Sequence, residues 1–425
     1  MKPAPGPTAP AARAPGHAFH VMAKPIGPRC NLGCDYCYYL EKETLYPGKH
    51  RFRMEDAVLI RLVRDTIRSQ VAAGVTEIGF AWQGGEPMLM GLDFFRRVIE
   101  LQARFCPPGH RVRNALQTNG TLITADWARF LAEHRFLVGL SLDGPPELHD
   151  RARPDRRGRP SSARVLKGLD LLQRHGVDVN VLTVVSRANV DSPLEVYRSL
   201  RGRGIEVIQF IAALERVLPD GRRAGPPGKG DRGAVVAPFC ISGAEYGRFL
   251  CTIFDEWLRH DVGRTFVQHF DVMLGLWMGE PASLCLFAET CGTALALEHN
   301  GDLYACDHYV YPEHRLGTIT ARPLGELAAL PRQRRFGKDK AATLSATCRA
   351  CRWRFACNGG CPKHRILPEP DGGPGRINHF CEGYRMFLDH AGPSLEAMAR
   401  LIRSGQPAAR IMERQSAATP SSAST

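Results

Sequence analysis

The sequence predicts an α/β fold in which a partial barrel of six βα units is followed by a small cysteine-rich domain. Three observations predict it. Short apolar runs alternate with amphipathic stretches from His20 to about Leu214, as expected of parallel strands joined by helices. Polar and glycine-rich turns follow several of these runs, at the sheet edge where such folds bind ligands. Eight of the fourteen cysteines then crowd into residues 285–381.

The expected strands are short apolar runs bounded by turn residues, and right-handed crossovers between them would curl the sheet into a barrel. The strands are His20–Ile26, Glu77–Gln83, Val112–Thr118, Leu137–Asp143, Asp178–Val185 and Val207–Leu214. The helices between them repeat apolar residues with helical period: Met54–Ala72, Asp93–Phe105, Thr124–Glu133, Ser162–His175 and Pro193–Arg201. Two more helices, Gly243–Arg259 and Thr265–Met278, are expected to connect the barrel to the second domain.

Shifts in composition divide the chain into five parts. Residues 1–18 and 403–425 are Pro/Ala/Ser-rich tails that bury too little surface to become ordered. Residues 19–242 form the barrel domain, 243–283 the helical connection and 284–402 the cysteine-rich domain. Within the barrel, the Pro/Gly/Arg-rich insertion 216–240 is expected to be a flexible loop. It either helps to hold a substrate over the barrel mouth or is only a surface loop.

Composition limits the class of protein. With 425 residues and 44% hydrophobic content, the chain can bury one large core and a smaller one. No apolar run reaches the roughly 18 residues of a membrane span, and the first 18 residues contain no apolar signal segment. The net charge is +13, with basic clusters at 151–164 and 331–340. These clusters do not contain the interleaved aromatic residues that are typical of nucleic-acid binding. We therefore expect a cytoplasmic protein that binds neither membrane nor nucleic acid, with a monomer as the default.

Three cysteines follow the first expected strand. Cys30, Cys34 and Cys37 have the spacing CxxxCxxC, and three thiolates this close together can hold three irons of a [4Fe-4S] cluster. With no fourth cysteine nearby, one iron would stay open to another ligand. The alternative is a zinc knuckle, which usually pairs its cysteines as CxxC and adds a fourth ligand.

The second expected strand ends in Gln83, Gly84, Gly85 and Glu86. Paired glycines let the backbone approach a ligand closely, and a carboxylate beside them can accept from an ammonium group. Taken alone, the same residues also make ordinary turns. Strand four ends similarly in Ser141 to Gly144.

The second domain contains eight cysteines, enough for two four-ligand iron-sulfur clusters or for two zinc sites. They are Cys285, Cys291, Cys306, Cys348, Cys351, Cys357, Cys361 and Cys381. His299 to Gly301 is a hairpin turn between the short strands Ala294–Glu298 and Asp302–Cys306. Cys106, Cys240 and Cys251 are left as incidental thiols.

Asp307 directly follows one of these cysteines. Burial beside an anionic cluster would raise its pKa and suit it to act as a general base. The alternative is that Asp307 only caps a turn.

These motifs resemble those of known enzymes. CxxxCxxC with an aromatic residue, Tyr36, before its last cysteine resembles the radical S-adenosylmethionine (SAM) superfamily. The residues Met22 to Pro25 and Cys37 to Lys42 resemble the anaerobic sulfatase-maturating enzymes in particular. The order of cysteines from Cys285 to Cys381 resembles the SPASM domain of peptide-modifying radical SAM enzymes.

The resemblance implies a radical SAM barrel, a SPASM domain with two auxiliary clusters, and three [4Fe-4S] clusters in all. SAM would bind the open iron, where one electron cleaves it to a 5′-deoxyadenosyl radical. The residues implied to contact SAM are Tyr36, Gln83, Gly84, Gly85, Glu86, Ser141, Asp143 and Leu214. Cys285, Cys291, Cys306 and Cys361 would hold the first auxiliary cluster, and Cys348, Cys351, Cys357 and Cys381 the second.

The implied activity is oxidation of a Cys or Ser of a sulfatase polypeptide to Cα-formylglycine, with Asp307 as the base. A flavodoxin- or ferredoxin-type protein would donate electrons. Two alternatives stay open at this point. One is a SPASM enzyme that modifies a different peptide, and the other is a zinc-stabilised binding module without catalytic activity.

Overall fold

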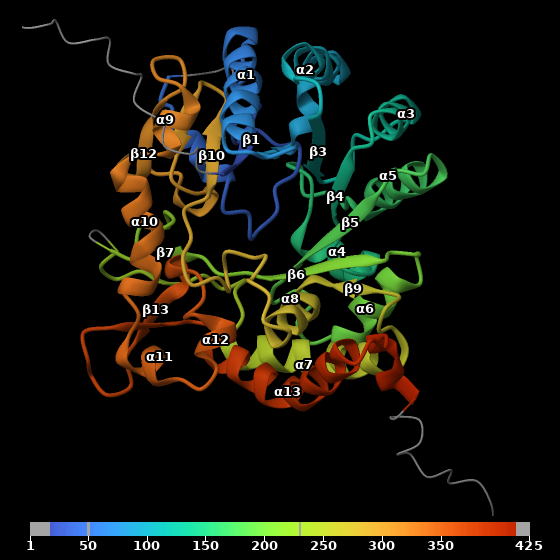
Figure 1. Ribbon diagram of the computed structural model, residues 1–425, viewed down its shortest axis with the longest axis vertical. Helices are drawn as coiled ribbons and strands as arrows, with labels where there is room; N and C mark the ends of the chain where they lie inside the picture. The colour runs from blue at the N-terminus through green and yellow to red at the C-terminus, as the bar shows by residue number, and fades with distance from the viewer. Residues whose placement is uncertain (1–17, 49–51, 229–230, 414–425) are drawn as a thin grey trace, which may run out of the picture.

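One ten-stranded sheet contains strands from both halves of the chain. The computed structural model describes residues 18–48, 52–228 and 231–413. The strand order is β12-β11-β10-β1-β2-β3-β4-β5-β6-β9. Every pairing from β10 to β9 is parallel, and the two pairings among β10, β11 and β12 are antiparallel. The strands fan out across the molecule, and helices α1, α2, α3 and α5 lie around the outside (Figure 1).

The sheet strands are β1 His20–Lys24, β2 Glu77–Trp82, β3 Arg111–Thr118, β4 Leu137–Ser141, β5 Val179–Val185, β6 Val207–Ala212, β9 Phe266–Val267, β10 Ala294–Glu298, β11 Asp302–Tyr304 and β12 Arg315–Thr318. Two small ribbons are β7 Arg216–Val217 with β8 Val235–Val236, and β13 Arg365–Pro368 with β14 Arg376–Asn378. The helices are α1 Asp56–Ala72, α2 Leu92–Phe105, α3 Ala125–Glu133, α4 Pro146–Ala152, α5 Ser162–Arg174, α6 Pro193–Arg201, α7 Gly243–His260, α8 Gln268–Trp277, α9 Leu324–Ala328, α10 Pro331–Ala342, α11 Ala346–Ala350, α12 Arg354–Cys357 and α13 Cys381–Arg403.

The predicted α/β class is confirmed, and each of the six predicted strands is present within two residues at each end. The hydrophobic core explains why. Strand residues such as Trp82, Leu140 and Val181 are fully buried, and so are helix residues such as Val98 and Val165. Alternating strands and amphipathic helices therefore bury their apolar faces against each other, as the sequence periodicity indicates.

The hairpin of the cysteine-rich region is not confined to a separate domain. Its first strand, β10, pairs in parallel with β1, in a register that runs from His20 opposite Ala294 to Lys24 opposite Glu298. The hairpin therefore extends the barrel sheet beyond β1. Parallel strands end at the same edge, so the end of β10 lies beside the loop that follows β1.

Two expectations of disorder are wrong. In the insertion 216–240, the described residues form the β7–β8 ribbon, which is stabilised by an ion pair of 2.7 Å between Arg216 and Asp231. Arg223 of this ribbon also donates to the backbone carbonyl of Asp35, 3.1 Å away. In the expected C-terminal tail, Ile411 is buried against the core. The expected tail residues 1–17 and 414–425 lie outside the described residues.

None of the helices within the described ranges is long and apolar enough to cross a membrane.

Candidate active site

Cys30, Cys34 and Cys37 lie on the loop after β1, and neighbouring backbone holds that loop in place. Gly33 N–H donates to the carbonyl of Pro154, 2.9 Å away. Burial raises the pKa of Cys30 to about 12 and that of Cys34 to about 11. Glu86, Cys34 and Cys37 also raise the pKa of Cys30. Since metal ligation requires thiolates, bound iron would have to displace these protons.

The glycine turn after β2 packs directly on this cysteine loop. Gly85 N–H donates to the Gly27 carbonyl over 2.8 Å, and Glu86 N–H donates to the Arg29 carbonyl over 2.8 Å. A Cβ on Gly85 would lie 1.9 Å from that Arg29 oxygen, and Gly84 has a φ of +136°. Only glycine allows this approach. The two turns therefore form one unit, in which Gln83, Gly84 and Gly85 stay partly exposed.

The Glu86 carboxylate points away from solvent into the core. It is fully buried and accepts from the Met88 and Asn119 amides and from the Thr118 hydroxyl, at 3.0, 2.8 and 2.8 Å. Burial raises its pKa to about 7. The expectation that this side chain is a free acceptor for an ammonium group is therefore wrong. Its carboxylate ties the turn after β2 to the end of β3.

Tyr36 and Asp143 contact each other. The Tyr36 hydroxyl donates to Asp143 over 2.5 Å and accepts from Arg153 Nη1 over 2.6 Å. Val184 N–H donates to the other Asp143 oxygen over 3.0 Å. All three side chains of this group are buried, and burial raises the pKa of both Tyr36 and Asp143. Their polar atoms hold the cysteine loop against the ends of β4 and β5.

The other two residues implied to contact SAM also lie at or just beyond strand ends. Ser141 ends β4, and its hydroxyl accepts from Gln117 Nε2 over 3.1 Å. Leu214 lies two residues beyond β6, and its side chain is buried. The parallel strands thus bring these residues to the sheet edge from which the cysteine loop also extends.

Asp307, just after the β10–β11 hairpin, meets residues of the barrel. Its Oδ1 lies 2.5 Å from the ammonium of Lys24, the last residue of β1. Its Oδ2 accepts from the Tyr38 hydroxyl on the cysteine loop. Lys24 is fully buried, donates to Gln83 Oε1 over 2.6 Å, and lies 4.4 Å from the centre of the Tyr39 ring. The end of β1 and the cysteine loop therefore both reach this carboxylate, and the turn after β2 joins them through Lys24.

The pKa of Asp307 shifts in the direction opposite to the one predicted. Burial alone would raise it, but the Lys24 ammonium, His308 and the hydrogen bond from Tyr38 outweigh burial, so the pKa lies below its ordinary value. The sequence showed the neighbouring cysteine but not the distant lysine. Asp307 is therefore ionised at neutral pH, and its lowered pKa makes it a weaker base than the prediction required.

The sequence reasoning missed four polar residues of this site. Lys24 and Tyr38 contact Asp307, and Lys363 pairs with Glu215 over 2.5 Å, both being 6% exposed. Glu215 follows β6, whereas Lys363 lies two residues after Cys361. One signal was available for Lys24, since a charged residue that ends a buried strand needs a partner.

The cysteines of the second region influence one another's pKa values in two sets. Burial, with smaller contributions from Cys361 and Cys285, raises the pKa of Cys291 to about 11. Cys361 and Cys285 act in the same way on Cys306. The second set consists of Cys357, Cys381, Cys348 and Cys351. Burial raises the pKa of Cys357 to about 12, and the other three cysteines contribute to this rise. These electrostatic neighbours fall within the two interleaved groups that the resemblance implies, and that each group holds a cluster stays a prediction.

Across residues 18–48, 52–228 and 231–413, no three His, Cys, Asp or Glu side chains converge tightly enough to hold one metal ion.

Comparison with known proteins agrees with this geometry. The radical SAM superfamily matches residues 25–212, and an iron-sulfur cluster-binding domain, SPASM, matches residues 285–352. Fold, cysteine loop and second cysteine region together define a radical SAM enzyme, with iron-sulfur clusters and SAM as its cofactors.

The relatives narrow this class. The chain is 41% identical over 397 residues to the serine-type anaerobic sulfatase-maturating enzyme of Bacteroides thetaiotaomicron, covering 93% of this chain and 94% of the relative. It is 32% identical over 385 residues to the cysteine-type enzyme of Clostridium perfringens, covering 90% and 99%. The solved structure of native anSMEcpe with bound AdoMet and Cp18Cys peptide is 31% identical, with a TM-score of 0.78 over 90% of this chain and 99% of that one. The protein belongs to the anaerobic sulfatase-maturating enzyme family.

The packing of Gly85 predicts a first experiment. Gly85→Ala would press a methyl group against the Arg29 carbonyl, and such overpacking costs about 1–3 kcal/mol. We expect a lower midpoint of chemical unfolding and less iron bound after anaerobic reconstitution. Gly275→Ala is the control, because its nearest neighbour would be 3.8 Å away. Equal stability and iron content in both variants would contradict the packing argument.

The ion pair between Lys24 and Asp307 predicts the result of a second experiment. Lys24→Met leaves the Asp307 charge without its partner, and breaking a buried pair from one side costs about 3 kcal/mol or more. The thermal unfolding midpoint should fall. In the double variant Lys24→Met/Asp307→Asn no charge is stranded, so most of the lost stability should return. Additive losses from the two substitutions would show that the pair is not coupled.

Proposed function

We propose that the protein oxidises a Cys or Ser side chain of a sulfatase polypeptide to Cα-formylglycine under anaerobic conditions. The observation that carries the proposal is the ionised Asp307 carboxylate, held between Lys24 and Tyr38 beside the cysteine loop. In this position, Asp307 would be a proton acceptor next to the site where the radical chemistry takes place. The names of the serine-type and cysteine-type relatives support the substrate class.

Cofactor binding follows from the cysteine sets. Cys30, Cys34 and Cys37 would hold a [4Fe-4S] cluster whose fourth iron is free to bind SAM, and the two sets of four would each hold another, making three in all. When bound, the first cluster and SAM supply the 5′-deoxyadenosyl radical that removes a hydrogen atom from the substrate. We expect Ser141 and the partly exposed Gln83, Gly84 and Gly85 to contact SAM, and Tyr36, Glu86, Asp143 and the buried Leu214 to shape that site.

Asp307 has a defined role in this reaction. As an ionised carboxylate it would take the proton of the substrate thiol or hydroxyl, while Lys24 and Tyr38 fix its orientation. The substrate side chain then loses one hydrogen atom from Cβ, one proton to Asp307 and one electron. Serine gives the aldehyde directly. Cysteine gives a thioaldehyde, which water hydrolyses with release of hydrogen sulfide. The lost electron needs an acceptor, and the two four-cysteine sets would hold suitable clusters.

The remaining partners are also proposals. A flavodoxin- or ferredoxin-type protein would reduce the first cluster, and the enzyme would act as a monomer in the cytoplasm.

The proposed function predicts the fate of a substrate peptide. Reconstituted protein with SAM and dithionite should convert Cys- and Ser-containing sulfatase peptides to aldehydes, detected by mass spectrometry and by a hydrazide reagent. Asp307→Asn should lower this conversion at least 100-fold, since the proton acceptor is lost. Glu313→Gln, at an exposed carboxylate a few residues away, is the matched control. Release of 5′-deoxyadenosine with neither peptide changed would contradict the substrate assignment.

The cysteine partition predicts iron contents. Cys361→Ala and Cys351→Ala, one from each set, should each lose about four irons per chain, and the double variant about eight. Cys251→Ala, a thiol outside all three sets, should lose none. Iron analysis and absorption spectra of anaerobically reconstituted protein provide the measurement. Loss of no more iron in the double variant than in either single one would contradict two separate sets.

A further inference from the structure

A group of exposed arginines packs against the outside of the cysteine loop and has no part in the proposed chemistry. We call residues 153–164, between α4 and the first turn of α5, the arginine loop. Its backbone joins the cysteine loop through the Gly33–Pro154 hydrogen bond and a bridge between Leu32 and Asp155. Arg156 Nε also donates to the Cys30 carbonyl over 2.7 Å. One side chain of this loop thus directly contacts Cys30 of the three-cysteine loop.

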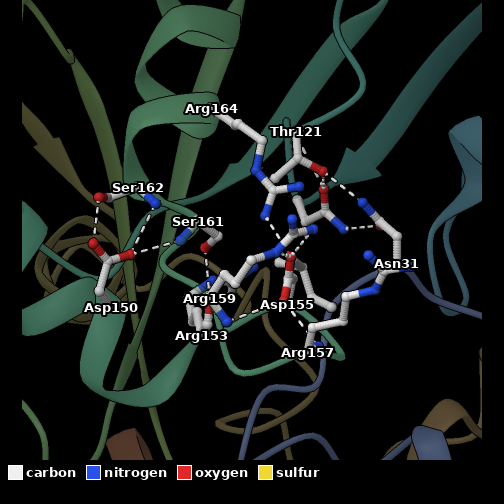
Figure 2. Close-up of polar contacts among 12 residues, drawn as sticks. Asn31, Thr121, Asp150, Arg153, Asp155, Arg157, Arg159, Ser161, Ser162 and Arg164 are labelled. Carbon is white, nitrogen blue, oxygen red and sulfur yellow. Dashed lines mark hydrogen bonds and ion pairs between the residues drawn. The ribbon is translucent and has the colours of Figure 1, made fainter.

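The arginine loop is built around one carboxylate. Asp155 accepts from the Arg157 and Arg159 amides, from Arg159 Nε over 2.8 Å and from Arg164 Nη2 over 3.5 Å (Figure 2). These contacts, with the Arg159 side chain contributing most, lower the pKa of Asp155 to about 2, so it stays charged. Figure 2 also shows that Asp150 is engaged by Ser161 and Ser162. The nearby acids are therefore occupied in shaping the loop.

The guanidinium groups remain available to a partner. Arg156, Arg157, Arg159 and Arg164 are all exposed, with 64% of the Arg159 side chain and 42% of the Arg164 side chain accessible. Four exposed cations against two ionised acids, Asp150 and Asp155, leave a local positive excess. Such a surface attracts acidic proteins and speeds their encounter, most strongly at low salt.

We propose that the arginine loop is the docking surface for an acidic one-electron donor protein, which reduces the cluster held by Cys30, Cys34 and Cys37. The contact from Arg156 to Cys30 places a bound donor one side chain away from a cluster ligand. The inference rests on the proposed function only in that these cysteines hold a reducible cluster. It does not depend on the sulfatase substrate.

The second basic cluster of the chain supplies a matched control. Arg334 and Arg335 on α10 are also exposed. That helix packs instead on the other cysteine region, where Gly337 abuts the Cys291 carbonyl. A donor bound there would face the first set of four cysteines and not the loop of three.

The test compares a protein donor with a small reductant. Reconstituted full-length enzyme and SAM are supplied with flavodoxin and its NADPH-dependent reductase, or with dithionite, and initial 5′-deoxyadenosine formation is measured. Arg157→Glu/Arg164→Glu should raise the flavodoxin concentration for half-maximal rate about tenfold, with the dithionite rate unchanged. Arg334→Glu/Arg335→Glu should change neither. Added salt should weaken the flavodoxin reaction of the unmodified enzyme more than that of the arginine-loop variant.

Three results would overturn the proposal. One is an unchanged flavodoxin dependence in the arginine-loop variant. Another is a loss confined to the α10 variant, which would place the docking surface there. The third is an equal fall with both reductants, which would mean that these arginines only support the cysteine loop. Since the readout is 5′-deoxyadenosine, failure of peptide oxidation alone would count against the proposed function and not against this surface.

Discussion

The parallel pairing of β1 with β10 is the constraint on which the site depends. It joins the barrel and the cysteine-rich region into one sheet, and its register sets Lys24 opposite Glu298. Both strands end at the same edge, so the hairpin after β10 returns Asp307 to the ammonium of Lys24. Tyr39 on the cysteine loop donates to Glu298 at the same junction. A proton acceptor and a cysteine loop far apart in sequence are thereby fixed side by side.

Burial explains why several motif residues support the site instead of facing a ligand. Glu86 and Asp143 are carboxylates enclosed by the protein, and each uses its oxygens to tie strand ends to a loop. Unpaired, such groups would destabilise the fold. The glycines beside Glu86 have the complementary role, because without side chains they let two loops touch. Buried polar contacts thus hold the backbone of these loops in position. A bound ligand would contact the residues that stay partly exposed.

The sequence predicted what depends on local pattern. Strand positions follow from apolar periodicity, the β10–β11 hairpin from its Asn300-Gly301 turn, and the two groups of cysteines from a spacing shared with known proteins. Contacts between distant segments were not predictable. The sign of the Asp307 pKa shift depends on Lys24, and the ordered β7–β8 ribbon depends on the Arg216–Asp231 ion pair and on Arg223 reaching the cysteine loop. No local pattern encodes these pairings.

The central proposal is that the 5′-deoxyadenosyl radical removes a hydrogen atom from Cβ of the substrate side chain. A peptide dideuterated at Cβ of its target Cys or Ser tests this most directly, with the mass of 5′-deoxyadenosine measured after a single turnover. We expect one deuterium to appear in 5′-deoxyadenosine for each aldehyde formed. Aldehyde formed together with unlabelled 5′-deoxyadenosine, or transfer only from a peptide deuterated at Cα, would contradict it.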